Sequence, residues 1–294
     1  MAPDELLKTA EVARLLRVHP KHVYRLIDQG LPTRRVGSEW RFARDDVLAW
    51  SAGRQRPSTV ARTTSPAGAF PPPLLGANGD VVIEVLLDQV LAQRQPLLGL
   101  VQADRSTALG HLGKRAILLA GFHGGSPPAA LEAERLARIH LVRREVGIAH
   151  PARVAMKGLK DLARRRLATR PSTAGVRAHF DRALASARLT PRSLHLRTTL
   201  FDSHREAACA VVRGQVDAAL TTRAWAHRLG LRFLSLAEES YDLLLFADCL
   251  GDRHVVGVCE VVQSSAFRAA LAKVAGYDPR GAGEIRYDFG DASR

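Results

Sequence analysis

Apolar residues near the N-terminus recur at helical spacing in two short stretches of the chain. The first stretch predicts a helix over 10–16 that begins after Thr9, a residue typical of helix N-caps. The second predicts a helix over 21–29, and Gly30 is suited to end it because glycine tolerates the left-handed conformation that follows many helices. The connection at 17–20 contains a proline, which disfavours helix at the residue before it. We therefore expect two short helices joined by a tight turn.

A hairpin and a third helix are predicted directly after these two helices. Apolar residues flank the Gly-Ser pair at 37–38, which favours a β-turn, and so predict a hairpin within 31–42. The segment 44–50 predicts a closing helix that buries Leu48 and Trp50.

Two short helices joined by about four residues are typical of a helix-turn-helix, whose second helix enters the major groove of DNA. Side chains near the start of that helix are placed to contact bases or phosphates, and arginines on the hairpin are placed for backbone phosphates. The alternative is a helical hairpin used for protein contacts, which leaves the basic side chains unexplained. The predicted DNA-binding residues are His19, Lys21, His22, Arg25, Arg34, Arg35 and Arg41.

The same segment resembles a known DNA-binding family over its whole length. The resemblance rests on five matching pieces, which are 7–16, 23–27, Leu31-Pro32, Arg41-Phe42 and 46–50. These pieces are similar to the excisionase-type winged helix-turn-helix, a relative of the MerR DNA-binding domain. The resemblance implies that residues 1–53 form a winged helix-turn-helix that binds double-stranded DNA.

A linker rich in Ser, Thr, Pro and Gly follows over 54–73 and ends in a run of prolines at 71–73. It has little apolar surface to bury and no period, which predicts a flexible tether that stiffens into polyproline II near its end. The alternative is a linker that is partly ordered by a dimer partner.

From residue 74 onward, short apolar runs alternate with helical patterns. This alternation predicts an α/β fold in which helices cover both faces of a sheet. The expected helices are 81–91, 129–138, 159–165, 177–187, 204–213, 224–229 and 267–274. The expected strands are 97–101, 116–120, 139–142, 146–149, 217–221, 233–236 and 241–246.

Three glycine-containing loops at 76–79, 121–126 and 169–177 are candidate ligand loops, because such sheets bind ligands at the carboxyl ends of their strands. The last offers hydroxyls, a glycine and two arginines, and favours an anion. For each loop the alternative is a plain turn that uses glycine for its positive φ. The predicted ligand-binding residues are Asn78, Ser106, Thr107, His123, Arg170, Ser172, Thr173, Gly175, Arg177, Thr221, Arg223 and Tyr241.

The part of the chain from about 76 to 287 resembles the periplasmic-binding-protein-like domain that often follows excisionase-type helix-turn-helices. The matching pieces are 119–123, 142–148, 158–162, 175–177, 210–218, 229–243, 267–271 and 276–278. The resemblance implies a two-lobed type II clamshell over 74–294, with a ligand held between the lobes. It also implies crossover strands near 139–148 and 233–246. Lobe I would take about 74–142 and 247–290, and lobe II about 143–246.

Some relatives of this domain bind molybdate or tungstate, so the resemblance makes an oxyanion one candidate ligand. The chain departs from the family pattern at two loops. Relatives usually carry a Gly-Ser-Gly-Thr-Arg-like loop where this chain has 173–177, which loses two hydroxyls, and Ala77 stands where a serine is common. The ligand is therefore left open between an oxyanion and another small molecule.

Composition narrows the class of protein further. The 294 residues carry a formal net charge of +14 and 46% hydrophobic residues. The excess of Lys and Arg is strongest in 138–214, which favours a polyanionic partner, although solvated basic surface is the equal alternative there. No apolar run spans a membrane and the N-terminus lacks a signal pattern, so we expect a cytoplasmic protein without a membrane partner.

The three cysteines, Cys209, Cys249 and Cys259, have no metal-ligand spacing, and their number fits a reducing compartment. We therefore expect no cofactor. The leading hypothesis is a ligand-responsive transcriptional regulator that acts as a homodimer, because specific DNA sites are usually two half-sites. An enzyme is disfavoured because no nucleophile motif surrounds His123 or any cysteine. An excisionase-like accessory protein would leave the large domain unexplained. Effector, operator and the sign of regulation stay open.

Overall fold

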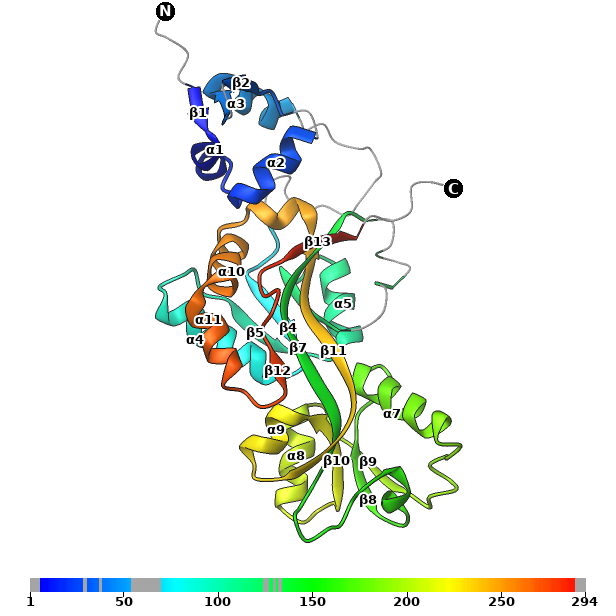
Figure 1. Ribbon diagram of the computed structural model, residues 1–294. Coiled ribbons are helices and arrows are strands. Elements are labelled where there is room, and N and C mark those ends of the chain that lie inside the picture. Colours follow the sequence, from blue (N-terminus) through cyan, green and yellow to red (C-terminus); the bar gives the residue numbers. More distant parts are fainter. Residues whose placement is uncertain are drawn as a thin grey trace, which may run out of the picture.

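The computed structural model describes residues 6–28, 31–36, 39–53, 70–123, 127–128, 131 and 134–288. They form a small N-terminal head, residues 6–53, which lies at one end of a longer body made of two lobes (Figure 1). We call the half of the body next to the head lobe I and the far half lobe II. The fold is thus multidomain, with a small helix-turn-helix region followed by a two-lobed α/β domain, as the sequence predicts.

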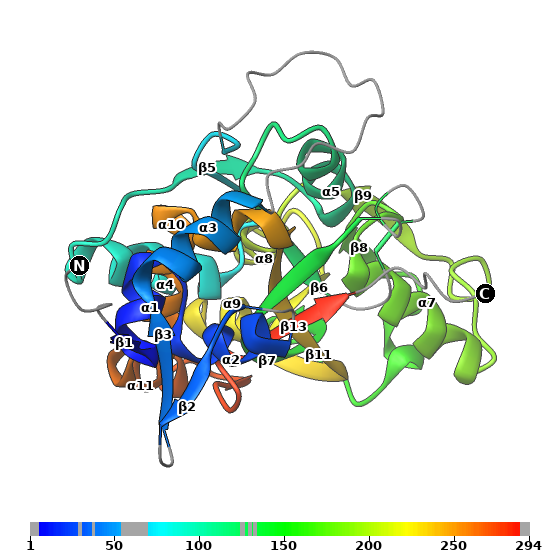
Figure 2. The same ribbon diagram turned by 90° about the horizontal axis from the view of Figure 1, so that it is seen from above.

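Three helices and a three-stranded sheet make up the head. Strand β3 lies between β1 and β2, and the β2–β3 hairpin extends to one side of the body when the molecule is seen from above (Figure 2). Helices α1 and α2 pack through a core that includes Val12, Val23 and Phe42, each fully buried. The elements are β1 (Leu6–Lys8), α1 (Thr9–Leu15), α2 (Pro20–Asp28), β2 (Arg34–Val36), β3 (Glu39–Ala43) and α3 (Arg44–Gly53).

Two details of the head differ from the expectation. Lys8, not Thr9, is the N-cap of α1, because Lys8 pairs with Arg41 of β3 and so stays extended up to the helix. Leu48 is 38% exposed, since Val47 rather than Leu48 faces the core, while Trp50 packs partly buried against it. The expected stop at Gly30 and the turn at 37–38 lie outside the described residues.

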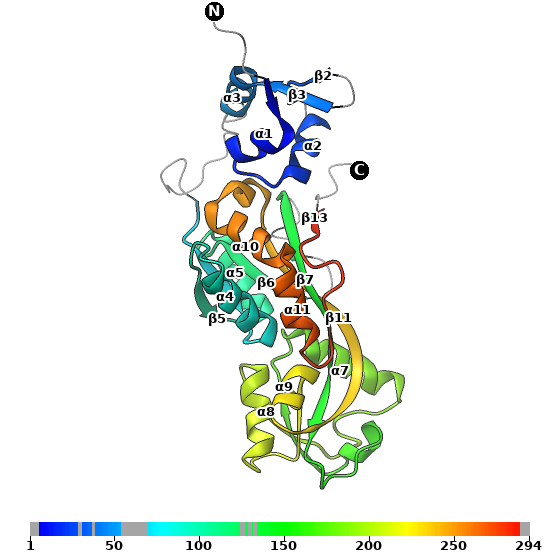
Figure 3. The ribbon, with the colours of Figure 1, turned by 60° about the vertical axis from the view of Figure 1, so that its left-hand side comes forward.

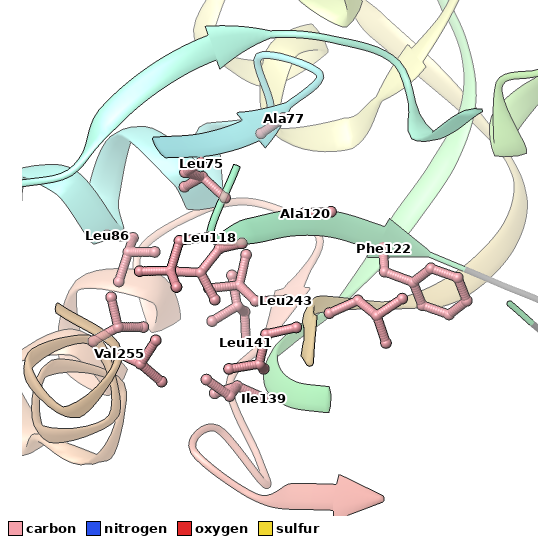
Figure 4. Packing of buried hydrophobic residues seen from close by; sticks show 14 of the residues in the cluster. Leu75, Ala77, Leu86, Leu118, Ala120, Phe122, Ile139, Leu141, Leu243 and Val255 are labelled. Carbon is pink, nitrogen blue, oxygen red and sulfur yellow. The ribbon is translucent and has the colours of Figure 1, made fainter. Parts of the chain in front are cut away.

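Lobe I is built on three parallel strands in the order β5-β4-β6. Helices α10 and α11 pack against α4, and α5 packs against β4 and β6. Leu75, Leu86, Leu118, Leu243 and Val255 meet in its core, where each is fully buried (Figure 4). The elements are β4 (Leu74–Ala77), α4 (Val81–Ala92), β5 (Gly99–Gln102), α5 (Arg105–Gly113), β6 (Leu119–His123), η2 (Ala247–Gly251), α10 (Arg253–Gln263), α11 (Ser265–Ala272), β12 (Tyr277–Asp278) and β13 (Ile285–Asp288).

Lobe II repeats the plan with parallel strands in the order β10-β8-β9. Its helices bury a core of aliphatic residues around Phe180 and Leu220. The elements are η1 (Leu159–Leu162), β8 (Arg166–Thr169), α7 (Gly175–Ser186), β9 (Arg197–Leu200), α8 (His204–Val212), β10 (Ala218–Thr222) and α9 (Arg223–Arg228).

Two long antiparallel strands, β7 (Leu136–His150) and β11 (Arg232–Phe246), run through both lobes and join them (Figure 3). Each expected crossover range falls within one of these strands. The sequence predicts two short strands in each place, because polar residues interrupt the apolar run at 143–145 and 238–240. Those residues continue the strand, and all of them except Ser240 form ion pairs.

Other differences have simple causes. Of the expected helix over 129–138, residues 129–130 and 132–133 lie outside the described residues, 134–135 are not helical and 136–138 is strand. The expected helix at 159–165 is a single 3₁₀ turn. Strands β8 and β9 were not predicted, since β8 contains only four residues and all four residues of β9 are exposed. Among the described residues no single helix is long and apolar enough to cross a membrane. The bent pair α10 and α11 reaches that length only when taken together.

Candidate functional site

Strand ends from both lobes meet at the junction between them. Asn78 and Asp80 follow β4, and His123 ends β6, all in lobe I. Arg170 follows β8 and His204 opens α8 after β9, both in lobe II. The carboxyl ends of parallel strands are where open α/β sheets hold their ligands. Each of these five side chains is buried, so the junction holds an unusual concentration of polar groups.

Arg144, on β7, is the centre of a buried ion network at this junction. Its guanidinium contacts Asp80 of α4's N-cap and lies 3.1 and 2.6 Å from Glu239 Oε1, measured from Nε and Nη2. The Tyr277 hydroxyl donates to the other oxygen of Asp80, and the Tyr241 ring centroid lies 4.4 Å from the guanidinium carbon. The network thus ties lobe I to both crossover strands.

Charge neutralisation explains how these groups stay ionised away from water. Burial lowers the pKa of Arg144, but Asp80 and Glu239 oppose it more strongly, so the net pKa lies well above the ordinary value. Burial raises the pKa of Glu239, yet the charge of Arg144 and the contacts of His123 and His179 bring its net pKa far below the usual range.

Two histidines flank Glu239 from opposite elements. His179 Nε2, on α7, lies 2.9 Å from Glu239 Oε2, and His123 Nδ1, on β6, lies 3.8 Å from the same oxygen. Gly175 opens α7 against His123 so closely that an added Cβ would lie 2.3 Å from His123 Nδ1. Burial lowers the pKa of His123 to about 4, so its ring is neutral at pH 7. Because an added Cβ at 175 would lie so close to the His123 ring, any side chain there would displace His123 or separate the lobes.

Arg170 presents a second buried guanidinium with a different environment. Its Nη1 donates to Phe201 O at 2.6 Å, but its Nε and Nη2 are buried without a hydrogen-bond partner among the described residues. Burial lowers its pKa to about 10, against the raising effect of Asp202 and Asp104. At pH 7 Arg170 is still charged, and its Nε and Nη2 have no hydrogen-bond acceptor among the described residues.

Two more buried polar atoms near Arg170 lack a hydrogen-bond partner among the described residues. They are His204 Nδ1 and Thr169 Oγ1. Burial lowers the pKa of His204 well below its ordinary value, and Arg170 and Arg144 lower it further. His204 is thus a neutral ring beside a cation. Because buried polar groups are nearly always hydrogen-bonded, these atoms mark a place suited to a polar guest.

Direct contacts hold the two lobes together around these groups. Thr173 Oγ1 donates to Asp104 Oδ2 at 2.9 Å, and Trp225 Nε1 donates to Gly79 O at 3.0 Å. Arg228 pairs with Glu84 at 2.5 Å on the same side as Trp225. The lobes therefore meet through contacts on more than one loop, so the buried groups lie in a closed junction.

The predicted ligand-binding residues fall into three groups. The structure brings together Asn78, His123, Arg170, Gly175, Thr221 and Tyr241 as buried or tightly packed residues of the junction. It places at exposed positions Ser106, Thr107, Ser172 and Thr173, of which Thr173 bonds Asp104 across the lobes. The remaining two are engaged with carboxylates elsewhere, namely Arg177 with Asp181 at 2.9 Å and Arg223 with Glu145 at 3.1 Å.

The sequence reasoning missed several members of the junction. They are Asp80, Asp104, Arg144, His179, His204, Glu239 and Tyr277. The usable signal was the presence of charged residues inside otherwise apolar crossover strands, as at Arg144 and Glu239. His204 and Asp80 carry no such signal, because each looks like an ordinary residue at the start of a helix.

The predicted DNA-binding residues lie at the start of α2 and on the hairpin. His19, Lys21 and His22 stand at the N-terminal end of α2, next to lobe I. Burial and Lys21 lower the pKa of His19, against the opposing effects of Gln263 and Glu260. Arg41 lies on β3, where its Nη1 donates to Trp40 O at 3.1 Å. The side chains of Arg25, Arg34 and Arg35 lie outside the described part of the structure.

Comparison with known families matches both parts of the chain. Residues 6–55 match the family model of a helix-turn-helix domain, and residues 98–263 match that of a PBP superfamily domain. The chain is 25% identical over 298 residues to a Bacillus subtilis (strain 168) protein named "Uncharacterized protein YvgK", covering 94% of this chain and 96% of that one.

The body is also similar to solved structures, and the first of the two below shows the same fold. PhnD1 from Prochlorococcus marinus (MIT 9301), in complex with methylphosphonate, matches with a TM-score of 0.50 and 13% identity, covering 71% of this chain and 93% of that one. A periplasmic substrate-binding protein of an ABC transporter from Coxiella burnetii matches with a TM-score of 0.47 and 16% identity, covering 70% of this chain and 98% of that one. At these identities the likeness extends to the fold alone.

Proposed function

We propose that this chain, which belongs to the PBP superfamily and carries a helix-turn-helix domain at its N-terminus, is a ligand-responsive DNA-binding regulator. In this proposal the junction between the lobes binds a small anion, and ligand binding changes the affinity of the head for double-stranded DNA. The protein acts in the cytoplasm as a homodimer and catalyses no reaction. A dimer is favoured because specific DNA sites are usually two half-sites.

The observation that supports anion binding at the junction is the buried guanidinium of Arg170. Its Nε and Nη2 have no acceptor among the described residues, whereas the nearby Arg144 forms ion pairs with two carboxylates. A guanidinium binds planar or tetrahedral anions through paired hydrogen bonds, which favours a ligand with at least two acceptor oxygens. His204 Nδ1 and Thr169 Oγ1 supply two further polar contacts beside it.

Oxyanions and small carboxylates both satisfy this chemistry. Molybdate and tungstate are the tetrahedral candidates that the sequence resemblance implies, and the methylphosphonate named with the PhnD1 structure is a third anion of similar size. The carboxylates of Asp104, Asp202 and Glu206 act on Arg170 and disfavour a ligand of high negative charge. We therefore favour a ligand with one or two negative charges.

Coupling to DNA requires that the ligand bind one state of the molecule better than another. Because the junction draws its side chains from both lobes, a ligand that fills it favours the closed state over the open one. The head contacts lobe I directly, so a change in how the lobes meet can alter the placement of the head.

The ligand is tested by thermal unfolding of the full chain with molybdate, tungstate, phosphate, methylphosphonate and small carboxylates. At 100 times its Kd a true ligand stabilises the protein by about 2.7 kcal/mol. Arg170→Met removes the stabilisation, whereas Arg177→Met, whose guanidinium pairs with Asp181, retains it. An anion that stabilises wild type and Arg170→Met equally would place the ligand elsewhere.

DNA binding is tested separately with a pool of random duplexes at fixed salt, followed by enrichment of the bound fraction. Lys21→Ala should weaken binding while the unfolding temperature stays the same, because Lys21 is an exposed residue at the start of α2. If wild type binds no duplex with or without the anion, the regulator hypothesis fails even if the anion binds.

A further inference from the structure

The face of lobe I next to the head contacts the helix that is predicted to read DNA. We call this face the docking surface and define it by Glu260 and Gln263 of α10, Glu284, and Ile285 and Tyr287 of β13. These five residues line two cavities between head and body, each of about 510 Å³, together with His19 and His22 from the head. Figures 1 and 3 show the head resting on this end of lobe I.

The central contact joins Tyr287 to His22. The Tyr287 hydroxyl and His22 Nδ1 hydrogen-bond at 2.6 Å, and the two rings stack with centroids 6.0 Å apart and an interplanar angle of 23°. His22 belongs to the first turn of α2, the part of a recognition helix that contacts base edges. The contact therefore occupies a side chain that DNA binding would need.

Neighbouring residues extend the contact. Gln263 and Glu260 of α10 both act on the His19 ring and raise its pKa, against the lowering effect of burial. Lys21 lines one cavity together with Glu284, which pairs with Arg286 of β13 at 3.0 Å, and with Arg268 of α11. On the other side, Leu16 O lies 3.9 Å from the position of a Cβ built on Gly251. The start of α2 thus contacts an aromatic side chain and lies beside amide and charged side chains of lobe I.

DNA and lobe I need the same end of α2. The major groove is about 12 Å wide and admits a helix, but not a helix with a protein domain at its N-terminal end. We propose that lobe I carries a docking surface for the start of α2, and that this surface and duplex DNA compete for His19, Lys21 and His22. The inference rests on the proposed function and names how the head is held back from DNA.

The docking surface is also continuous with the junction between the lobes. Tyr287 pairs with Ala137 of β7, and Tyr277, at the other end of the same C-terminal segment, pairs with Arg144 of β7. Tyr277 contacts Asp80 in the buried ion network. The segment 277–288 therefore touches the junction at one end and the head at the other.

The first test compares duplex affinities of the full-length protein by fluorescence anisotropy at fixed salt. Weakening a docked state that dominates the population raises the apparent affinity by the same factor. We expect about fivefold tighter binding for Tyr287→Phe, which loses one hydrogen bond, and about tenfold or more for Tyr287→Ala. Leu200→Ala, an exposed leucine on β9 of lobe II, is the matched control and should bind as wild type does.

The second test fixes the docked state covalently. Arg17→Cys and Gly251→Cys are combined in one chain and joined by a short bifunctional maleimide with a reducible spacer. Arg17 and Leu250 line the same cavity. Burial raises the pKa of both Cys249 and Cys259 to about 12, which slows their reaction, and the partly buried Cys209 is replaced by serine in this background. The linked protein should bind duplex at least tenfold more weakly, and reduction of the spacer should restore binding.

The outcomes separate this inference from the proposed function. If Tyr287→Ala binds duplex no better than wild type, or if the linked protein binds as well as the reduced one, competition is overturned while DNA binding stands. If wild type, Tyr287→Ala and Tyr287→Phe all fail to bind any duplex, the proposed function is overturned and the competition with it. Thermal unfolding of each variant reports whether the chain remains folded.

Discussion

Two buried arginines a short distance apart have opposite surroundings. Arg144, in the crossover strand β7, contacts two carboxylates and has the Tyr241 ring against it. Arg170, at the end of β8 in lobe II, donates to one carbonyl oxygen and leaves two N–H directions without a protein acceptor among the described residues. Arg144 is 1% and Arg170 is 0% exposed, so solvent does not account for the difference.

The comparison separates a residue that holds the fold from one that is suited to a guest. A buried charge is tolerated when partners neutralise it, as Asp80 and Glu239 do for Arg144. A buried guanidinium without such partners costs folding free energy, which an anionic ligand would recover on binding. Arg144 and Arg170 thus differ in how their charges are balanced, although both lie in the junction between the lobes.

The largest effect is expected from Arg144→Met. Removal of the guanidinium leaves Asp80 and Glu239 buried without a counter-charge, which typically costs about 3–5 kcal/mol. Urea unfolding should report this loss for the full chain. Arg143→Met is the matched control, because Arg143 is the next residue on β7 and pairs with Glu238 on the surface, where both side chains are more than half exposed. The control should lose less than about 1 kcal/mol.

A loss of stability below pH 6.5 is the next largest effect. His123 is neutral in the folded protein because its pKa is lowered from 6.5 to about 4, and His204 is lowered in the same direction. As the pH falls through this window the unfolded chain takes up protons that the folded chain does not. Stability should therefore fall by about 1.4 kcal/mol per pH unit for each histidine.

Urea unfolding at a series of pH values between about 4 and 7 measures this slope. His123→Gln removes the histidine beside Glu239, and His204→Gln removes the one beside Arg170. Each variant should therefore lower the slope of stability against pH by the contribution of about one proton. Glu239, whose pKa is lowered, adds to the loss as the pH falls below its unfolded value of 4.5, and so acts in the same direction. A wild-type curve that is flat from pH 6.5 to 4.5 would contradict the buried neutral state of both rings.

Periodicity predicted much of the fold, because long amphipathic or apolar runs leave few alternatives. The helices at 81–91 and 204–213 and the strand at 217–221 are confirmed within one residue or so at each end by α4, α8 and β10. The crossover strands were divided in two because β7 carries a buried arginine in mid-strand. Burial of that arginine depends on Asp80 and Glu239, which are distant in the sequence and invisible to any local pattern.

The candidate site was less predictable than the fold. Strand-end loops correctly indicated Arg170 and His123 as residues of the junction, since topology alone brings such ends together. The sequence analysis did not separate Arg170 from Arg177, seven positions later, although an i,i+4 pair of Arg177 with Asp181 could be read from the predicted helix. The difference arises from Asp181, one helical turn beyond Arg177, which pairs with it, while the fold buries Arg170 away from such a partner.

A smaller effect of opposite sign is expected from Arg170→Met in the absence of added anion. The substitution removes two buried nitrogens, Nε and Nη2, whose N–H groups have no acceptor among the described residues, and loses one hydrogen bond to Phe201 O. Unsatisfied buried donors cost about 1–3 kcal/mol, so the variant should be about 1 kcal/mol more stable than wild type. Urea unfolding in anion-free buffer measures the change, and a loss as large as that of Arg144→Met would erase the distinction between the two arginines.

The smallest effect is expected from Tyr241→Phe, which tests what the ring beside Arg144 contributes. The Tyr241 hydroxyl donates to Asn78 Oδ1 at 3.2 Å, a long hydrogen bond, while its ring lies 4.4 Å from the Arg144 guanidinium carbon. The variant keeps the ring and loses the hydroxyl, so we expect a loss of only about 0.5 kcal/mol. Tyr241→Leu, which removes the ring as well, should cost clearly more in the same urea experiment. Equal losses for the two variants would mean that the hydrogen bond from the hydroxyl to Asn78 contributes more stability than the contact between the ring and the Arg144 guanidinium.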